Sequence, residues 1–224
     1  LLGSTSFVLF YTLLGVPFGR LADRVSRKRL VAVGLFLWCL CSGMTGFMTS
    51  FGGLFLCRVL VGVGEATLGP AALSLLSDYF PPRLRATVSA VYSAGIPCGS
   101  GLSLFLGGMI GQEYGWRWAF YLLGFPGLLL CGLVLSLREP PRGQSEARAA
   151  GPVATDSEAA PTEATTDWRV LYRTPALRCH YLGYALMAVA ANSLGMWIPT
   201  LLTRVYHMQL AQVGRLLGAM TLVG

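Results

Sequence analysis

A short charged turn, Gly19-Arg20-Leu21-Ala22-Asp23-Arg24-Val25-Ser26-Arg27-Lys28-Arg29, separates two long stretches of sequence that carry no charged residue. These stretches are residues 1–19 and 30–57, and three further stretches share the property: 86–112, 118–137 and 179–203. Each of the five is close to or above the roughly 20 residues with which a helix crosses the hydrocarbon core of a bilayer. The turn and its surroundings therefore predict an all-α polytopic membrane protein.

The composition agrees with this prediction. Of the 224 residues, 54% are hydrophobic and 12% are charged, whereas a soluble domain carries roughly 25% charged residues. This difference excludes a soluble enzyme, a nucleic-acid binder and a secreted disulfide scaffold. The net charge of +7 comes from arginines gathered in a few short loops, which is a signal of membrane topology rather than of a nucleic-acid partner.

The positions of the arginines predict which loops face the cytoplasm. Loops 20–29 and 78–85 and the linker 139–170 are rich in Arg and are expected on the cytoplasmic side, in the inner or cell membrane. The intervening connections, near residues 49–53 and 112–116, hold Glu113 as their only charged residue and are expected to face outward.

The apolar runs predict helices rather than barrel strands, because they exceed the length of a barrel strand and an open sheet edge is not satisfied in lipid. Spans are expected at 1–20, 30–49, 52–77, 84–111, 117–137 and 176–203, with a further helix from Ala211. Residues 1–138 then form a first transmembrane bundle, 139–170 a flexible linker rich in Pro, Ala, Ser and Thr, and 171–224 the start of a second bundle. Two bundles joined by a polar loop are typical of a transporter.

Six cysteines lie in or beside the apolar runs and are expected to pack as small apolar side chains, so no metal site is predicted. The chain begins without Met and its last apolar run stops at Gly224, so we expect a fragment cut at both ends.

The charged turn resembles the signature loop between the second and third helices of the major facilitator superfamily. Six residues stand in the family pattern, and Ser26 occupies a position that is usually glycine; the six are Gly19, Leu21, Asp23, Arg24, Arg27 and Lys28. The resemblance implies a cytoplasmic gate formed by Gly19, Asp23, Arg24, Arg27 and Lys28, with Asp23 capping a helix or pairing with an arginine. The alternative is a positive loop that sets topology alone.

A second motif, Arg58-Val59-Leu60-Val61-Gly62-Val63-Gly64-Glu65-Ala66, lies within an otherwise apolar helix. Arg58 and Glu65 are seven residues apart, so they share one helix face, about 10 Å apart along the axis. An unpaired charge at the bilayer centre costs at least about 2.5 kcal/mol, so both are expected to face an internal polar cavity and to find partners on other helices. The motif resembles the Arg-containing fourth helix of the same superfamily, and its Gly-Val-Gly-Glu-Ala ending resembles the Spinster branch. A purely structural salt bridge is the alternative.

Other segments extend the resemblance from the family's second helix into its eighth, leaving the first helix and the last four outside this chain. Gly95, Pro97, Gly99 and Gly101 resemble the Gly-Pro motif of the fifth helix and are expected to bend and pack it. Asn192 and Trp197 are candidates to line the cavity, with helix packing and interfacial anchoring as alternatives. The implied fold is the helical bundle of the superfamily.

The function expected from these residues is secondary active transport by alternating access, without an enzyme's chemistry and without a cofactor. Glu65 would bind and release a proton, because burial favours a neutral carboxyl and an adjacent arginine favours the anion, and Arg58 would be its partner or an anion anchor. The expected partners are protons, the bilayer and a small-molecule substrate, carried by a monomer. Spinster-like proteins are linked to lysophospholipids and sphingolipids, so the substrate is expected to be amphipathic and anionic; a proton symporter or antiporter for a small organic anion or drug, and a non-transporting scaffold or sensor, are the alternatives.

Overall fold

The computed structural model describes residues 2–145 and 173–223, and every regular element in these ranges is a helix. The helices follow one another along the chain as α1 (Leu2–Arg24), α2 (Arg27–Met44), η1 (Thr45–Phe47), α3 (Phe51–Ala66), α4 (Leu68–Tyr79), η2 (Pro82–Leu84), α5 (Arg85–Glu113), α6 (Trp116–Gly124), α7 (Gly127–Ser136), α10 (Pro175–Arg204) and α11 (Leu210–Val223). The all-α fold predicted from the sequence is confirmed.

Five stretches are long and apolar enough to cross a membrane: Arg27–Phe47, Phe51–Tyr79, Pro82–Glu113, Trp116–Ser136 and Pro175–Arg204. They agree with five of the six predicted spans. The sixth, at 1–20, falls within α1, which has the length of a span but is not among these five.

Two of the predicted spans are each built from two consecutive helices. The span at 52–77 breaks at Thr67, whose hydroxyl donates a hydrogen bond to the Gly64 carbonyl, and Pro70 then lacks the N–H that would continue the ladder. The span at 117–137 breaks at Phe125 and Pro126 for the same lack of a donor. A hydropathy pattern detects neither break, because the interrupting residues are themselves apolar or small.

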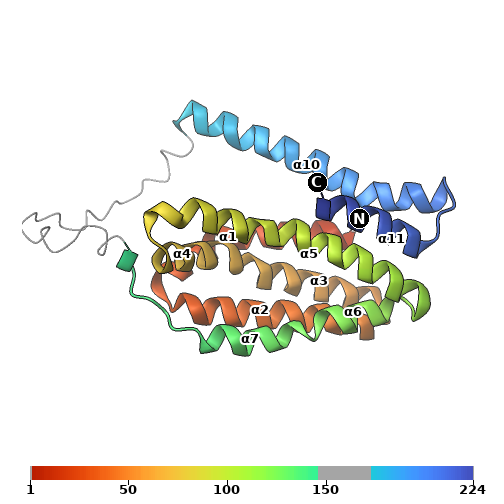
Figure 1. The fold of residues 1–224 in the computed structure, drawn as a ribbon, viewed down its shortest axis with the longest axis horizontal. Coiled ribbons are helices and arrows are strands. Elements are labelled where there is room, and N and C mark those ends of the chain that lie inside the picture. The colour runs from red at the N-terminus through yellow and green to blue at the C-terminus, as the bar shows by residue number, and fades with distance from the viewer. Residues whose placement is uncertain (1, 146–172, 224) are drawn as a thin grey trace, which may run out of the picture. The chain divides into compact units, whose positions relative to one another are not determined.

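The described residues before the linker form one compact unit together with α11 (Figure 1). α3 packs against both α1 and α2. α2 also packs against α6 and α7, and α5 packs against α11. The helices approach closely at glycines: a Cβ added to Gly64 of α3 would lie 2.6 Å from the Gly34 carbonyl of α2. Such contacts are the usual means by which membrane helices associate.

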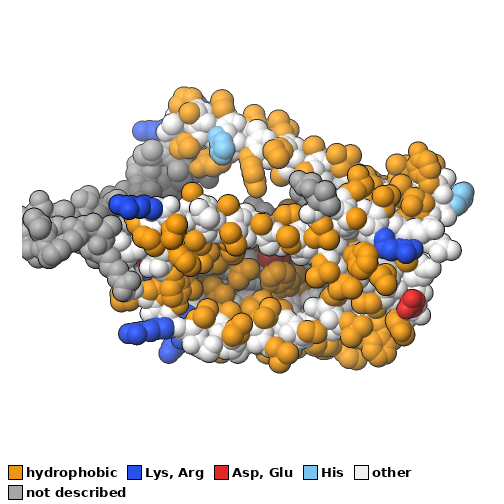
Figure 2. All heavy atoms as spheres, viewed as in Figure 1, with side chains coloured by type: hydrophobic (Ala, Val, Ile, Leu, Met, Phe, Trp, Pro, Cys, Tyr) orange, Lys and Arg blue, Asp and Glu red, His pale blue; other side chains and the backbone are white. Residues whose placement is uncertain are grey.

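The buried apolar cluster of this unit, formed by Ala22, Leu30, Val31 and Ala71, lies where α1 meets α2 and α4. Hydrophobic side chains are spread over much of the face drawn in Figure 2, as expected of helices that contact lipid.

A second compact unit, residues 151–209, contributes α10 to the described part of the chain. α10 is a single helix of 30 residues, close to the predicted span at 176–203. Most of the predicted flexible linker, residues 146–170, lies outside the described residues, whereas its first residues, 139–145, are held against the first unit by contacts described below.

Candidate functional site

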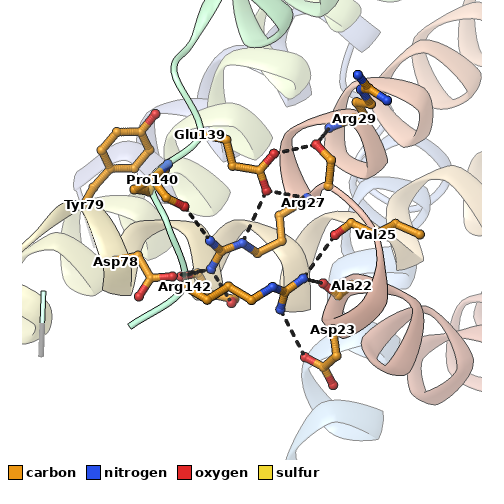
Figure 3. A network of polar contacts seen from close by, with 12 residues as sticks. Ala22, Asp23, Val25, Arg27, Arg29, Asp78, Tyr79, Glu139, Pro140 and Arg142 are labelled. Carbon is orange, nitrogen blue, oxygen red and sulfur yellow. Dashed lines mark hydrogen bonds and ion pairs between the residues drawn. The ribbon is translucent and has the colours of Figure 1, made fainter. Parts of the chain in front are cut away.

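A polar network closes one end of the first unit, where the α1–α2 turn, the end of α4 and residues 137–145 meet (Figure 3). We call this end the basic end. At its centre lies Arg27, the first residue of α2, with an exposed fraction of 1%. Its guanidinium pairs with the carboxylate of Asp78 and donates hydrogen bonds to the Ser74 hydroxyl at 3.1 Å and to the Pro140 carbonyl at 3.0 Å. Its Nε makes no hydrogen bond within the described part of the chain but lies 3.6 Å from the Glu139 carboxylate. Arg27 is therefore a buried charge with two carboxylates and further hydroxyl and carbonyl oxygens around it, the condition under which a buried charge is tolerated.

Residues 137–145, which we call the 137–145 segment, tie the two turns of this end together. Glu139 accepts hydrogen bonds from the Ser26 hydroxyl and from the Arg27 backbone N–H, the latter at 2.8 Å. Further along, the Gly143 N–H donates to Asp78 at 3.0 Å, and the Ser145 hydroxyl donates to the Ser77 carbonyl at 2.8 Å. The segment thus links the α1–α2 turn to the end of α4.

Arg142 lies on the outer side of the network. It donates to the carbonyls of Ala22 and Val25, at 2.6 and 3.1 Å, near the C-terminal end of α1, where the helix dipole is negative. Its guanidinium is 3.9 Å from the Asp23 carboxylate, and the Asp23 side chain is 78% exposed. This outer pair is solvated and contributes little to stability on its own.

The five residues predicted for the gate occupy different places in this network. Arg27 is its buried centre, Asp23 is its exposed partner of Arg142, and Lys28 donates to the Leu137 carbonyl at 2.8 Å. Arg24 is exposed, and a Cβ added to Gly19 would lie 4.0 Å from Pro70. Asp23 does not cap a helix; that position belongs to Ser26.

Ser26 replaces the glycine that is usual in the family pattern, and the structure shows how the turn accommodates it. Its backbone is extended, with φ −60° and ψ 117°, so the turn needs no left-handed residue here. The hydroxyl accepts a hydrogen bond from the Arg29 N–H at 3.3 Å, which makes Ser26 the N-cap of α2, and donates to Glu139.

Sequence reasoning did not place Asp78, Glu139 and Arg142 in the site. Their partners lie far away in the sequence; Arg27 and Asp78, for example, are 51 residues apart. The available signal was that Asp78 directly follows an apolar run and that Glu139 follows another after a single arginine, which places both acids at the same end of the predicted spans as the charged turn.

The surroundings of Glu139 shift its protonation equilibrium. Partial burial acts to raise the pKa of this carboxyl, but the hydrogen bonds from Ser26 and Arg27 and the charge of Arg27 outweigh burial and lower the pKa below its ordinary value. Glu139 is therefore ionised in the folded network.

The second candidate site lies on α3. Arg58 is half-buried, and its guanidinium lies over the ring of Phe120 on α6, 5.3 Å from the centroid. It borders a hollow of about 290 Å³ whose other lining residues are Thr45, Phe51, Leu54, Phe55, Trp116 and Phe120. Arg58 thus places one positive charge in a mainly aromatic hollow.

Glu65, two turns further along α3, is also half-buried. Its carboxyl group is close enough to the Tyr92 hydroxyl of α5 for an electrostatic interaction, and Tyr92 interacts in the same way with Tyr11 of α1. Among the described residues, neither Arg58 nor Glu65 forms an ion pair. The acidic or basic partners that the sequence predicted for them are not found in this part of the chain.

The remaining predicted residues have simpler surroundings. A Cβ added to Gly101 would meet α11 within 3 Å, whereas Gly95 and Gly99 have no atom within 4 Å of that position, and Pro97 lies inside the continuous helix α5. On α10, the Asn192 amide donates to the Ala188 carbonyl of its own helix, and Trp197 is 58% exposed. The bending, packing and cavity-lining roles of Pro97, Gly95, Gly99, Asn192 and Trp197 stay predictions. The described residues hold no cluster of three or more potential metal ligands.

Residues 2–224 match the family model described as Major Facilitator Superfamily. Human protein spinster homolog 1 is 35% identical over 206 residues, which cover 89% of this chain and 38% of the relative. An MFS-type efflux pump of Mycolicibacterium smegmatis is 33% identical over 208 residues, 93% of this chain and 46% of the pump.

Solved structures give the same result. The crystal structure of a bacterial homolog to the human lysosomal transporter Spinster, in an inward-facing and unoccupied conformation, superposes with a TM-score of 0.81 at 27% identity, covering 97% of this chain and 50% of that one. This chain therefore spans at most about half the length of the relatives that it matches.

Proposed function

The chain belongs to the major facilitator superfamily, and from this premise we propose that the protein is a proton-coupled secondary active transporter that works by alternating access. Its Spinster-like relatives and its multi-pass helical structure support a membrane transporter, and they give no support to an enzyme. The bacterial homolog was solved in an inward-facing conformation, and we assign the present structure to the same state.

The observation that carries this proposal is the position of Arg58 and Glu65. Both are half-buried on one face of α3, inside a segment long enough to span the membrane, and neither has a charged partner among the described residues. A charge kept at this depth costs free energy that a purely structural helix avoids. We assign Glu65 the binding and release of the coupled proton, and Arg58 the anchoring of an anionic group.

The hollow beside Arg58 supports an amphipathic anion as substrate. Its aromatic lining fits an apolar body, and the guanidinium fits a phosphate or carboxylate. The test is a thermal-shift screen of the complete protein against a lysophospholipid, small organic anions and drugs. A compound that stabilises the wild type should lose that effect in Arg58→Ala and keep it in Arg117→Ala, the matched control, since Arg117 also lies over an aromatic ring but does not border the hollow. A hit that survives Arg58→Ala contradicts the anchor.

The efflux-pump relative favours a second candidate, a proton symporter or antiporter for a small organic anion or drug. The same screen separates the two candidates. Stabilisation by the lysophospholipid favours an amphipathic substrate, and stabilisation by small organic anions or drugs alone favours the second candidate. A third reading, a non-transporting scaffold or sensor, makes Arg58 and Glu65 purely structural. In that case replacing both by a neutral pair would leave the protein's function unchanged.

We assign the basic end to the cytoplasm and its network to the cytoplasmic gate. The support is the concentration of arginine in the α1–α2 turn and the 137–145 segment, which is the pattern of cytoplasmic loops. Arg27 anchors the wall of this gate, and the exposed pair of Asp23 and Arg142 lies at its rim. The carrier is proposed to act as a monomer.

A further inference from the structure

The crossing of α5 and α11 is the closest described contact between a helix that precedes the linker and one that follows it. Gly108 and Gly214 face each other, and a Cβ added to Gly108 would lie 3.0 Å from the Gly214 Cα. Gly101 and Gly218 form a second pair, in which the added Cβ of Gly101 would lie 2.9 Å from the Gly218 carbonyl. The pairs run in opposite order along the two helices, so the helices are antiparallel. At both places the two backbones approach closely, and at the second pair the side chains of Leu222 and Phe105 pack beside the glycines.

At one end of this crossing, a side chain joins the two helices. The side-chain oxygen of Gln112, in the last turn of α5, accepts a hydrogen bond of 2.8 Å from the backbone N–H of Ala211. α11 begins at Leu210, so this N–H belongs to the first turn of α11, where backbone donors have no partner within their own helix. Gln112 therefore caps α11 from a neighbouring helix.

The cap lies at the end of the unit opposite the basic end. α5 starts at Arg85, whose guanidinium donates to Ser145 in the 137–145 segment, and it runs 29 residues before it reaches Glu113. At about 1.5 Å per residue this helix is long enough to cross a bilayer. The Gln112 contact therefore joins the two helices at the outward side, given the proposed orientation.

We propose that Gln112 is a positioning residue of the transport cycle: its cap on α11 latches the outward end shut, and the outward-facing state forms when this hydrogen bond is released. The inference rests on the proposed alternating access. The glycine pairs bring the two backbones close with small side chains at the contact, so α11 can tilt against α5, and the hydrogen bond of Gln112 at the outward end adds to the stability of the closed arrangement. One hydrogen bond corresponds to roughly a two- to twelvefold change in the ratio of the two states.

The test measures the separation of the outward ends in the complete protein. Spin labels are placed at Tyr114→Cys on the end of α5 and at Leu216→Cys on α11, both exposed positions, in a background without native cysteines, and the distance distribution is recorded in nanodiscs. Gln112→Ala removes the acceptor and should raise the ratio of long to short distances about two- to twelvefold. Gln112→Glu keeps an acceptor oxygen and should retain the short-distance population. Glu113→Gln, a change at the exposed neighbouring residue, is the matched control.

An unchanged distribution in Gln112→Ala overturns the latch, as does a Gln112→Glu variant that behaves like Gln112→Ala. A fixed single distance in every variant overturns it equally. The Gln112→Glu variant also shows whether the position tolerates substitution, so a folding defect is not mistaken for an open state. Failure of proton coupling at Glu65 would leave this distance measurement unaffected, so the latch and the proposed coupling can fail separately.

Discussion

At the residue scale, the charged side chains inside the helical unit fall into two groups, those with a charged partner and those without one. Arg27 pairs with the Asp78 carboxylate and donates hydrogen bonds to a hydroxyl and a carbonyl oxygen. Arg58 and Glu65 are half-buried and have no charged partner among the described residues. Since an unpaired buried charge lowers stability, the second arrangement is better explained by function than by folding.

Replacing Arg27 tests the first arrangement. Arg27→Ala leaves the Asp78 carboxylate, which is 9% exposed, without its cation, and we expect a loss of about 3–5 kcal/mol in the free energy of unfolding. The measurement is denaturant unfolding in detergent, with the exposed neighbour Arg29→Ala as the control, for which a change within about 0.5 kcal/mol is expected. The double variant Arg27→Met with Asp78→Leu should recover part of the loss. Equal effects of Arg27→Ala and Arg29→Ala would show that the pair does not stabilise the fold.

The lowered pKa of Glu139 makes the stability of the folded protein depend on pH. Because its pKa is lower in the folded protein than in the unfolded chain, it contributes stability above the unfolded pKa, and this contribution is lost as the pH falls through the lowered folded pKa. The thermal unfolding midpoint of the wild type should therefore fall on acidification. Glu139→Gln should flatten this dependence below about pH 5. An equally steep acid dependence in Glu139→Gln would mean that another carboxyl is responsible.

At the scale of elements, close helix contacts are made by glycine, and a neighbouring glycine provides an internal control. Gly108 of α5 faces Gly214 of α11, whereas the adjacent Gly107 has no atom within 4 Å of an added Cβ. Glycine is therefore required at one position and not at the next. The same contrast separates Gly101, which meets α11, from Gly95 and Gly99.

Replacing Gly108 and its neighbour Gly107 by alanine should have different effects on stability. Gly108→Ala forces α5 and α11 apart, and we expect a destabilisation of about 1–3 kcal/mol together with a larger separation of the two helices. Gly107→Ala gains helix propensity and should be neutral or slightly stabilising. Thermal unfolding and the spin-label distance between α5 and α11 measure both effects. If the two variants behave alike, the glycine crossing is not a close contact.

The sequence could predict the helices and the charged turn between two of them, because each depends on local composition. It could not predict the partners of Arg27, since Asp78 and Glu139 are 51 and 112 residues away and only the fold brings them together. Nor could it show that the helix breaks at Pro126, because Pro17, Pro97 and Pro199 lie inside continuous helices. The capping role of Ser26 depends on a backbone conformation that a family pattern does not specify.

At the scale of the whole molecule, the basic end is tied together by a polar network, whereas the crossing of α5 and α11 is packed through glycines and capped by Gln112. The network around Arg27 joins the α1–α2 turn, α4 and the 137–145 segment through many hydrogen bonds. The crossing of α5 and α11 depends on glycine contacts and on Gln112. Movement is therefore expected at the crossing rather than within the basic end. Membership of the major facilitator superfamily fits this division.

The central claim is that Glu65 couples transport to protons, and uptake by proteoliposomes of the complete protein tests it most directly. A labelled compound selected by the Arg58 screen is used, with and without an imposed pH gradient, and Glu113→Gln is the matched control because it removes an exposed acid from the end of α5. We predict that Glu65→Gln loses the acceleration of uptake by the pH gradient and still exchanges the compound between equal concentrations. Acceleration of the same size in Glu65→Gln and wild type would contradict the account.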